Sequence, residues 1–235
     1  MTARENIIYF GAGPSRSQTD VLRLAGANLL NYQGSGLGLT EQSHRSRPSA
    51  DIIKKAEEHV RDLLAVPEGY SVIFMQGGGT TQFSAVAYNL FGFWVKKQLM
   101  KGLDKEEVRR KLQRKENPVA MDYLITGVWS GKACKEARRL FGDQRVNVAV
   151  DARDNNGRYR TIPREETWKQ TSPDDNVFTY YCDNETVDGV EFPAFPAALE
   201  GRLVACDMSS NILTRRVDVN KYAVIFVRLP SPPPW

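Results

Sequence analysis

Short apolar runs alternate along the chain with stretches whose apolar residues recur at helical spacing. Six runs rich in β-branched and aromatic residues predict strands, at residues 71–75, 121–126, 146–150, 177–182, 203–206 and 223–227. Several are apolar at nearly every position, which is typical of strands buried on both faces. Helical patterns lie between them, at 49–65, 82–90 and 131–141. The alternation predicts an α/β fold with a mostly parallel sheet and flanking helices.

A basic segment at about 94–118 interrupts this alternation. It holds nine basic and four acidic residues, so it accounts for the net charge of +4, and the rest of the chain is close to neutral. Asp104 and Glu107 are spaced as in a capping box, which predicts a helix start. The apolar stripe consists mainly of Val108 and Leu112. We therefore predict a solvated helical insertion at the surface rather than a nucleic-acid-binding patch.

Bulk composition is that of a soluble globular protein. The chain has 235 residues, of which 41% are hydrophobic and 26% charged. No window has the 18 apolar residues of a membrane span, and the first residues lack the apolar core of a secretory signal. Cys134, Cys182 and Cys206 have no metal-ligand spacing. These features predict buried free thiols, no metal, no membrane contact and a cytoplasmic location.

A glycine-rich segment follows the first predicted strand and precedes a helix. It reads Gln76-Gly77-Gly78-Gly79-Thr80-Thr81. Consecutive glycines let a backbone approach an anion, and free N–H groups at a helix start point towards it. The segment lacks the Gly-Lys-Ser/Thr ending of a nucleotide-binding P-loop. Its local pattern fits either a phosphate site at Gly79 and Thr80 or a tight turn that binds nothing.

Polar and aromatic residues follow three other predicted strands, at the sheet edge where open α/β folds bind ligands. Asp207 needs a partner there, such as a protonated pyridine nitrogen, or it caps the following segment. Trp129 either stacks on a flat heterocycle or belongs to the core, and Thr186 occupies the equivalent place after a third strand. In a polar loop, His44 and Arg45 suit capture of a carboxylate or phosphate, or are simply exposed.

Six segments in matching order resemble the phosphoserine aminotransferase family, over about residues 7 to 226. They are Phe10-Gly11-Ala12-Gly13-Pro14, Ser43-His44-Arg45-Ser46, Gln76-Gly77-Gly78-Gly79, Gly127-Val128-Trp129-Ser130, Asn184-Glu185-Thr186-Val187 and Cys206-Asp207-Met208-Ser209-Ser210-Asn211. The resemblance implies a type I fold of the class-V aminotransferases, with pyridoxal 5'-phosphate as cofactor. It also implies a cytoplasmic homodimer that serves L-serine biosynthesis. The implied reaction converts 3-phosphohydroxypyruvate and glutamate to phosphoserine and 2-oxoglutarate.

The resemblance also implies a role for each matching residue. Gly79 and Thr80 would hold the cofactor phosphate, Trp129 would stack on its ring, and Thr186 would contact the ring's polar edge. Asp207 would pair with the pyridinium nitrogen. His44 and Arg45 would bind the substrate's anionic side chain, across a dimer interface.

The chain departs from the family after its last predicted strand. There the family has the lysine that forms a Schiff base with the cofactor, whereas Val227-Arg228-Leu229 and a Pro-rich tail stand here. Lys221 precedes the strand and is no substitute. We expect an incomplete cofactor-binding large domain at 1–226, a non-family tail at 227–235 and no small C-terminal domain. On this reading the chain has no catalytic lysine, does not transaminate at a normal rate and is poorly stable alone.

Other interpretations remain open. The chain could act as a non-catalytic regulatory or dimer-docking short form of the same enzyme. It could also belong to another type I aminotransferase or to a cysteine desulfurase. His44 and Arg45 argue for a phosphorylated or dicarboxylic substrate, and a substrate screen would decide between these families.

Overall fold

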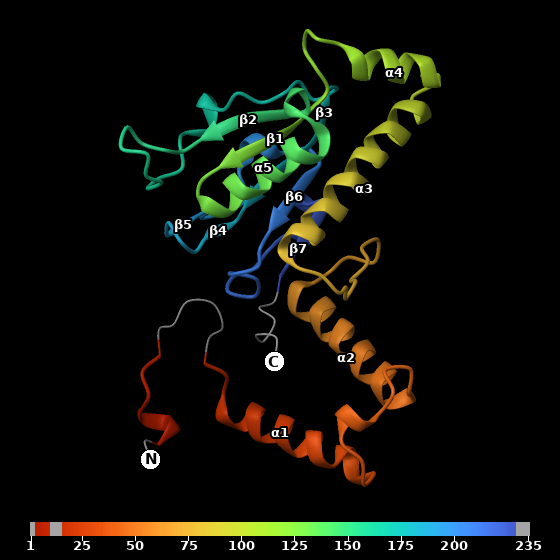
Figure 1. The fold of residues 1–235 in the computed structure, drawn as a ribbon, viewed down its shortest axis with the longest axis vertical. Helices are drawn as coiled ribbons and strands as arrows, with labels where there is room; N and C mark the ends of the chain where they lie inside the picture. Colours follow the sequence, from red (N-terminus) through yellow and green to blue (C-terminus); the bar gives the residue numbers. More distant parts are fainter. Residues whose placement is uncertain (1–2, 10–15, 229–235) are drawn as a thin grey trace. The chain divides into compact units, whose positions relative to one another are not determined.

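A computed structural model of the chain describes residues 3–9 and 16–228 (Figure 1). They form two compact units, of which one ends at Ile73 and the other begins at Phe74. The single domain expected over 1–226 therefore stays a prediction. The family-like segment at residues 10–14 and the tail beyond residue 228 lie outside the described residues.

The first unit is helical. Its two α-helices are α1 (Thr19–Leu30), which the sequence pattern did not predict, and α2 (Arg47–Leu64), which confirms the helix expected at 49–65. Ser46 caps α2 by accepting a hydrogen bond from the backbone N–H of Ser49 at 3.4 Å. The helix ends at Ala65, whose φ of 48° is left-handed. No residue of either helix is fully buried.

The second unit is built on a five-stranded sheet. In spatial order its strands are β2 (Val146–Asp151), β1 (Ala120–Ile125), β3 (Asn176–Cys182), β6 (Val204–Asp207) and β7 (Val224–Phe226). All neighbouring strands are parallel. A small antiparallel hairpin of β4 (Asn184–Glu185) and β5 (Val190–Glu191) follows β3. This arrangement confirms the predicted α/β fold and five of the six predicted strands.

Apolar side chains cover both faces of the sheet. Every residue of β1 and β3 is buried, as their continuous apolar runs predicted. Tyr123 and Tyr180 lie in one core cluster with α3 (Gly79–Met100) and α5 (Val128–Phe141). Leu124 and Tyr181 lie in a second cluster, with loop residues. Since successive side chains of a strand point to opposite faces, the two clusters occupy the two sides of the sheet.

The strand predicted at 71–75 is wrong. These residues form no strand, and Ile73, Phe74 and Met75 are 71%, 54% and 60% exposed. An apolar β-branched run becomes a strand only where a neighbouring strand accepts its backbone hydrogen bonds. No described residue does so here. Strand β7 lies at the edge of the sheet and pairs only with β6 among the described strands. Phe74 and Met75, which belong to the same unit, do not pair with it.

The predicted basic insertion is helical, but one of its faces is buried rather than exposed to solvent. Helix α3 continues through it to Met100, and α4 (Lys105–Gln113) follows, with the expected capping box between Asp104 and Glu107. One face is core, because Trp94 and Val108 are only 2% and 4% exposed. The surface-helix prediction is therefore wrong for this face. It failed because Val108 packs with the α3 residue Trp94 in the same core cluster.

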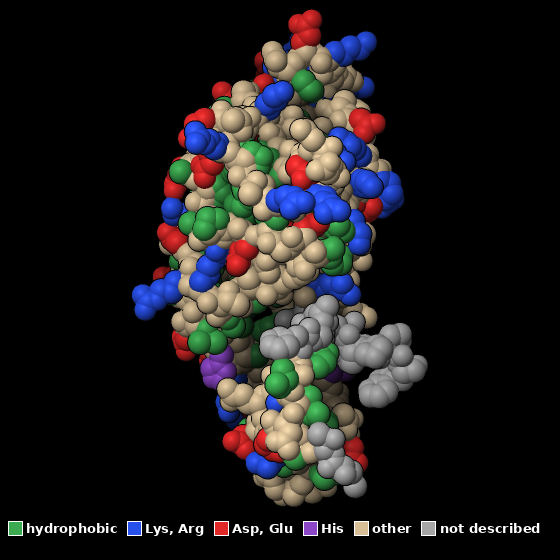
Figure 2. All heavy atoms as spheres, turned by 90° about the vertical axis from the view of Figure 1, so that its left-hand side faces the viewer, with side chains coloured by type: hydrophobic (Ala, Val, Ile, Leu, Met, Phe, Trp, Pro, Cys, Tyr) green, Lys and Arg blue, Asp and Glu red, His purple; other side chains and the backbone are tan. Residues whose placement is uncertain are grey.

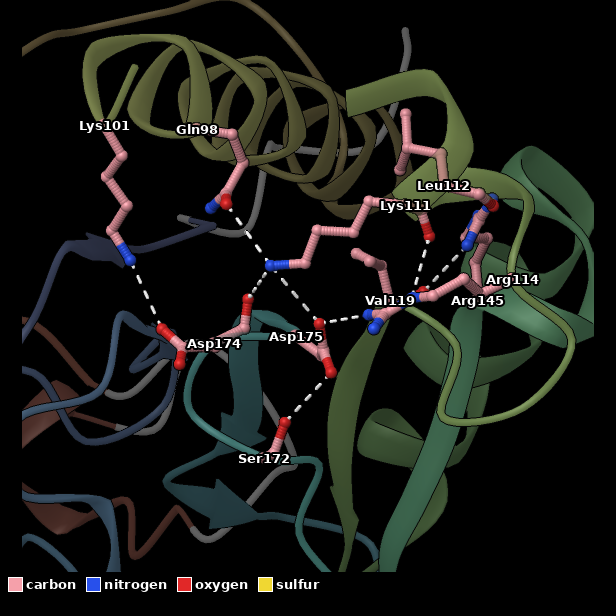
Figure 3. A network of polar contacts seen from close by, with 10 residues as sticks. All are labelled: Gln98, Lys101, Lys111, Leu112, Arg114, Val119, Arg145, Ser172, Asp174 and Asp175. Atoms are coloured by element: carbon pink, nitrogen blue, oxygen red, sulfur yellow. Dashed lines mark hydrogen bonds and ion pairs between the residues drawn. The ribbon is translucent and has the colours of Figure 1, made fainter. Parts of the chain in front are cut away.

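Ion pairs also fasten α4 to the start of β3 (Figure 3). The Lys111 ammonium lies 3.4 Å from the Asp175 carboxylate and donates to the side chain of Gln98 on α3 at 3.3 Å. Arg114 pairs with the same carboxylate. These contacts lower the pKa of Asp175, although its partial burial acts in the opposite direction. The insertion thus anchors the C-terminal half of α3.

The surface shows no single basic area on the face drawn in Figure 2, where Lys and Arg side chains lie among Asp and Glu. The three cysteines are buried free thiols, as predicted. Within residues 3–9 and 16–228, no helix is both long and apolar enough to cross a membrane.

Candidate functional site

Four loops meet at the edge of the sheet where the parallel strands end. They follow β1, β3, β6 and β7. The residues at this edge are Trp129 in the first turn of α5, Thr186 directly after β4, Asp207 as the last residue of β6, and Arg228 after β7. The carboxyl ends of parallel strands face the same side, which is where open α/β sheets bind ligands. The register confirms the alignment, because Asp207 lies beside Cys182 of β3 and Phe226 of β7.

Asp207 is a half-buried carboxylate with one oxygen left over. Its Oδ1 accepts hydrogen bonds from the backbone N–H of Ser209 at 2.9 Å and from the Ser209 hydroxyl at 2.5 Å. Burial raises the pKa of Asp207, and the Ser209 hydrogen bonds and the charge of Arg228 oppose that rise. No described residue donates a hydrogen bond to Oδ2. A half-buried carboxylate in this position favours a cationic or N–H partner.

Trp129 and Thr186 form a pair at the same edge. The indole N–H of Trp129 donates to the Thr186 hydroxyl oxygen at 2.9 Å. Trp129 is 37% exposed, so it is not the core residue that the alternative reading of the sequence allowed. The Lys132 ammonium lies 4.3 Å from the centre of the indole ring, within cation–π range. No described residue accepts the hydroxyl hydrogen of Thr186, so this hydroxyl can still donate.

Hydrogen bonds connect these loops to each other. Asn184 donates from its side chain to the Ser210 hydroxyl at 3.0 Å, and that hydroxyl donates back to the Asn184 carbonyl at 3.1 Å. The backbone N–H of Arg228 donates to the Ser209 hydroxyl at 2.8 Å. The loops after β3, β6 and β7 are therefore held as one unit around Asp207.

The glycine loop lies at this site as well. A Cβ atom added to Gly79 would approach the Arg228 side chain to 3.3 Å. The first turn of α3 contains no acidic residue, and no side chain caps it. The N–H groups of Gly79, Thr80 and Thr81 have no acceptor among the described residues. With the helix dipole, they make an open anion site.

The start of α5 is closed by contrast. The N–H of Val128 donates to Asp188 at 2.8 Å, and those of Trp129 and Ser130 donate to the Glu185 carboxylate at 2.8 Å each. Local sequence patterns missed Glu185 and Asp188, because their partners lie more than fifty residues away. Of the two helix starts, α3 is the one that can bind an anionic ligand.

His44 and Arg45 lie in the first unit, in the loop before α2. Both are exposed, and the Arg45 guanidinium donates to the His44 ring at 3.4 Å. The backbone N–H of Arg45 donates to the Ser43 hydroxyl at 3.2 Å. Their role in substrate binding stays a prediction. Among the residues that the structure describes, no cluster of His, Cys, Asp or Glu is arranged to hold a metal ion.

Known proteins resemble the chain in both sequence and structure. Residues 7–100 match the class-V aminotransferase family. Phosphoserine aminotransferase of Drosophila melanogaster is 41% identical over 94% of this chain and 52% of its own length. The Saccharomyces cerevisiae enzyme of that name is 38% identical, over 94% of this chain and 53% of its own length. The chain is therefore similar to class-V aminotransferases over residues 7–100 and to phosphoserine aminotransferases over most of its length.

Solved structures support the same family. The chain is similar to the pyridoxal-phosphate-bound phosphoserine aminotransferase of Trichomonas vaginalis, with a TM-score of 0.72 and 33% identity over 93% of this chain. Phosphoserine aminotransferase from Bacillus circulans gives a TM-score of 0.69 and 29% identity over 92% of it. The chain spans about half the length of the relatives that it matches.

Proposed function

We propose that the protein is a pyridoxal-phosphate-dependent aminotransferase of L-serine biosynthesis. It converts 3-phosphohydroxypyruvate and glutamate to phosphoserine and 2-oxoglutarate. One observation supports the proposal above all: an uncapped helix start, the Trp129–Thr186 pair and Asp207 lie together at one edge of the sheet. When bound, the cofactor supplies an electron sink for bond breaking at the substrate's α-carbon. The similarity to phosphoserine aminotransferases supports the choice of substrates.

The start of α3 fits the cofactor's phosphate. Three backbone N–H groups, at Gly79, Thr80 and Thr81, have no acceptor among the described residues, and the exposed Thr80 adds a hydroxyl donor. The absence of acidic residues from this turn leaves the helix dipole uncancelled. Arg228 beside Gly79 adds positive charge. A dianion at this helix start would satisfy groups that otherwise bond only to water.

The other residues fit a flat cationic heterocycle. The exposed indole of Trp129 offers a face for stacking, and the Thr186 hydroxyl can donate to a polar ring substituent. Ser209 holds only one oxygen of Asp207, so Oδ2 remains to accept a hydrogen bond from a protonated ring nitrogen. That contact keeps the ring protonated and therefore electron-withdrawing. Asp207 thus holds a proton on the nitrogen.

Substrate recognition falls to His44 and Arg45 in this proposal. Their paired imidazole and guanidinium suit the phosphate or carboxylate of the substrate side chain. We propose that they reach the site of a second copy in a cytoplasmic homodimer. Among the described residues no lysine follows β7, where the family resemblance implies the Schiff-base lysine.

The test is glutamate formation from phosphoserine and 2-oxoglutarate by the protein purified with its cofactor from its own cells. The 235 residues alone have no lysine after β7 and are not expected to transaminate at a normal rate. The proposal predicts turnover that falls when phosphoserine is replaced by serine, because Arg45 then loses its anion. Arg45→Ala should raise KM for phosphoserine, whereas Arg47→Ala, on an exposed neighbour, should leave it unchanged. No turnover with bound cofactor, or equal turnover of serine and phosphoserine, would refute the proposal.

A further inference from the structure

The carboxylate of Glu185 is fully buried at the start of α5. It accepts hydrogen bonds from the N–H groups of Trp129 and Ser130 at 2.8 Å each and from the Ser130 hydroxyl at 2.5 Å. Among the described residues no Lys, Arg or His forms an ion pair with it. Its negative charge is therefore stabilised by three donors and the positive end of a helix dipole.

The backbone is shaped to let Glu185 approach. A Cβ atom on Gly127 would lie 2.5 Å from the Glu185 side chain, so a side chain at residue 127 is incompatible with this contact. Ser130 extends the network, because its hydroxyl oxygen accepts from the N–H groups of Thr126 and Gly127 at 3.0 and 3.2 Å. The whole turn from β1 into α5 is thus organised around one carboxylate.

Two links join this turn to the loop after β3. The backbone N–H of Trp129 bonds to Glu185, and the indole N–H of Trp129 bonds to the next residue, Thr186. The backbone and the ring of one tryptophan are therefore fixed by two consecutive residues. Loss of the backbone link would let the ring move, even with the indole hydrogen bond retained.

We propose that Glu185 is a positioning residue that fixes the Trp129–Thr186 pair for stacking on a heterocyclic cofactor and closes the start of α5 to anions. The proposal rests on the proposed function, because the ring to be stacked is that of pyridoxal phosphate. Glu185 acts through Trp129 and Thr186 and touches no reacting atom. With α5 closed, the phosphate is directed to the open start of α3.

The first experiment measures hydrogen exchange at residues 128–130 in the cofactor-free native protein. Glu185→Gln keeps the shape but has one acceptor oxygen, so one backbone N–H of α5 faces an NH2 group. Protection should fall about 10-fold or more, as for loss of a hydrogen bond to a charged group. Glu136→Gln is the control, since Glu136 lies on the same helix and pairs with exposed Arg139. Unchanged protection in Glu185→Gln would overturn the proposal.

The second experiment measures the dissociation constant of pyridoxal phosphate. It should rise about 10-fold in Glu185→Gln and stay unchanged in Glu136→Gln. The near-ultraviolet circular dichroism of Trp129, obtained by subtracting Trp129→Phe, should weaken in Glu185→Gln. A lower melting temperature with unchanged affinity and dichroism would make Glu185 a stabilising cap alone and overturn the positioning role.

A milder variant covers the case in which Glu185→Gln does not fold. Ser130→Ala removes one donor to Glu185 and should change exchange and affinity in the same direction, by about 3-fold. No change in Ser130→Ala would contradict the proposal. If wild-type protein does not bind pyridoxal phosphate, the proposed function fails and this inference with it. If wild type binds and Glu185→Gln binds equally well, only this inference fails.

Discussion

Helices α3 and α5 start beside the same sheet edge and differ in what occupies their first turns. The N–H groups of α5 are taken by Glu185 and Asp188, whereas those of α3 have no acceptor among the described residues. Both helix starts carry the positive end of a helix dipole, but only the start of α3 has N–H groups available to an anion. The comparison shows that an anion site requires both a helix start and the absence of internal carboxylates that would fill it.

The two helices also differ in where they are anchored. Helix α5 is fixed at its start, next to the site, by hydrogen bonds to the β4–β5 hairpin. The apolar face of α3 is buried from Phe83 onwards, and its polar contacts lie in its C-terminal half, where Gln98 meets Lys111 of the insertion. Because these polar contacts lie away from the start of α3, the N–H groups there stay available to a ligand. The insertion thus supports the site without reaching it.

The largest effect is expected for Asp207→Asn. Asparagine has no charge to hold the ring nitrogen protonated, so transamination should fall about 100-fold or more, as when a preorganised electrostatic contact is removed. The readout is kcat for phosphoserine with saturating cofactor. Asp218→Asn, at an exposed turn, is the control. A loss below about 3-fold would mean that Asp207 does not pair with the ring.

Gly127→Ala tests the closed start of α5. The new Cβ would lie 2.5 Å from Glu185, and relieving the clash should cost about 1–3 kcal/mol of the free energy of unfolding. Gly131→Ala, on the same helix, meets nothing closer than 3.8 Å and should be neutral or stabilising. Denaturant unfolding of both variants gives the measurement. Equal stability of the two would show that Glu185 can leave this turn at no cost.

Asp175→Asn tests the distant anchor of α3. It should lower the free energy of unfolding by about 1–3 kcal/mol at neutral pH, because two cations lose a charged partner. Arg114 and Lys111 keep the folded-state pKa of Asp175 below 3.8. The stability it contributes is therefore present above pH 3.8 and disappears as pH falls through the folded-state value.

The pH dependence supplies the check on that anchor. Unfolding curves of wild type and Asp175→Asn should differ at pH 7 and converge in strong acid. Asp174→Asn is a matched neighbour, whose partner Lys101 is well exposed, and it should cost less than about 1 kcal/mol. A constant difference at every pH would contradict the ion-pair explanation.

Thr186→Val should have the smallest effect. Valine keeps the shape of threonine but cannot accept the hydrogen bond from the indole N–H of Trp129. That N–H then donates to water instead. Affinity for pyridoxal phosphate should fall about 3-fold or more, because the proposed hydrogen bond from the Thr186 hydroxyl to the cofactor ring is lost as well. Thr186→Ser should restore it by returning the hydroxyl. If Thr186→Ser does not restore the affinity, hydrogen bonding by the Thr186 hydroxyl does not account for the loss.

The sequence predicted most of the sheet because strands such as β1 and β3 are apolar at almost every position. It was wrong at 71–75, where strand formation depends on a neighbour rather than on the run itself. It placed Asp207, Trp129 and Thr186 at the carboxyl edge of the sheet because each follows a predicted strand, and the structure has them at that edge. It missed Glu185, whose partners are 55 and 56 residues away and leave no local pattern. It underestimated the burial of Val108, which depends on Trp94 of another helix.

The most direct test uses Gly78→Asp at the open start of α3. Gly78 has ordinary extended dihedral angles, and nothing lies within 4 Å of an added Cβ, so aspartate can cap the helix. The measurement is the dissociation constants of pyridoxal phosphate and of pyridoxal, which lacks the phosphate, for wild type and variant. Pyridoxal phosphate should bind at least about 10-fold more weakly to the variant, and the binding of pyridoxal should be unchanged. Equal loss for both ligands, or no loss for either, would contradict the assignment of the phosphate to α3.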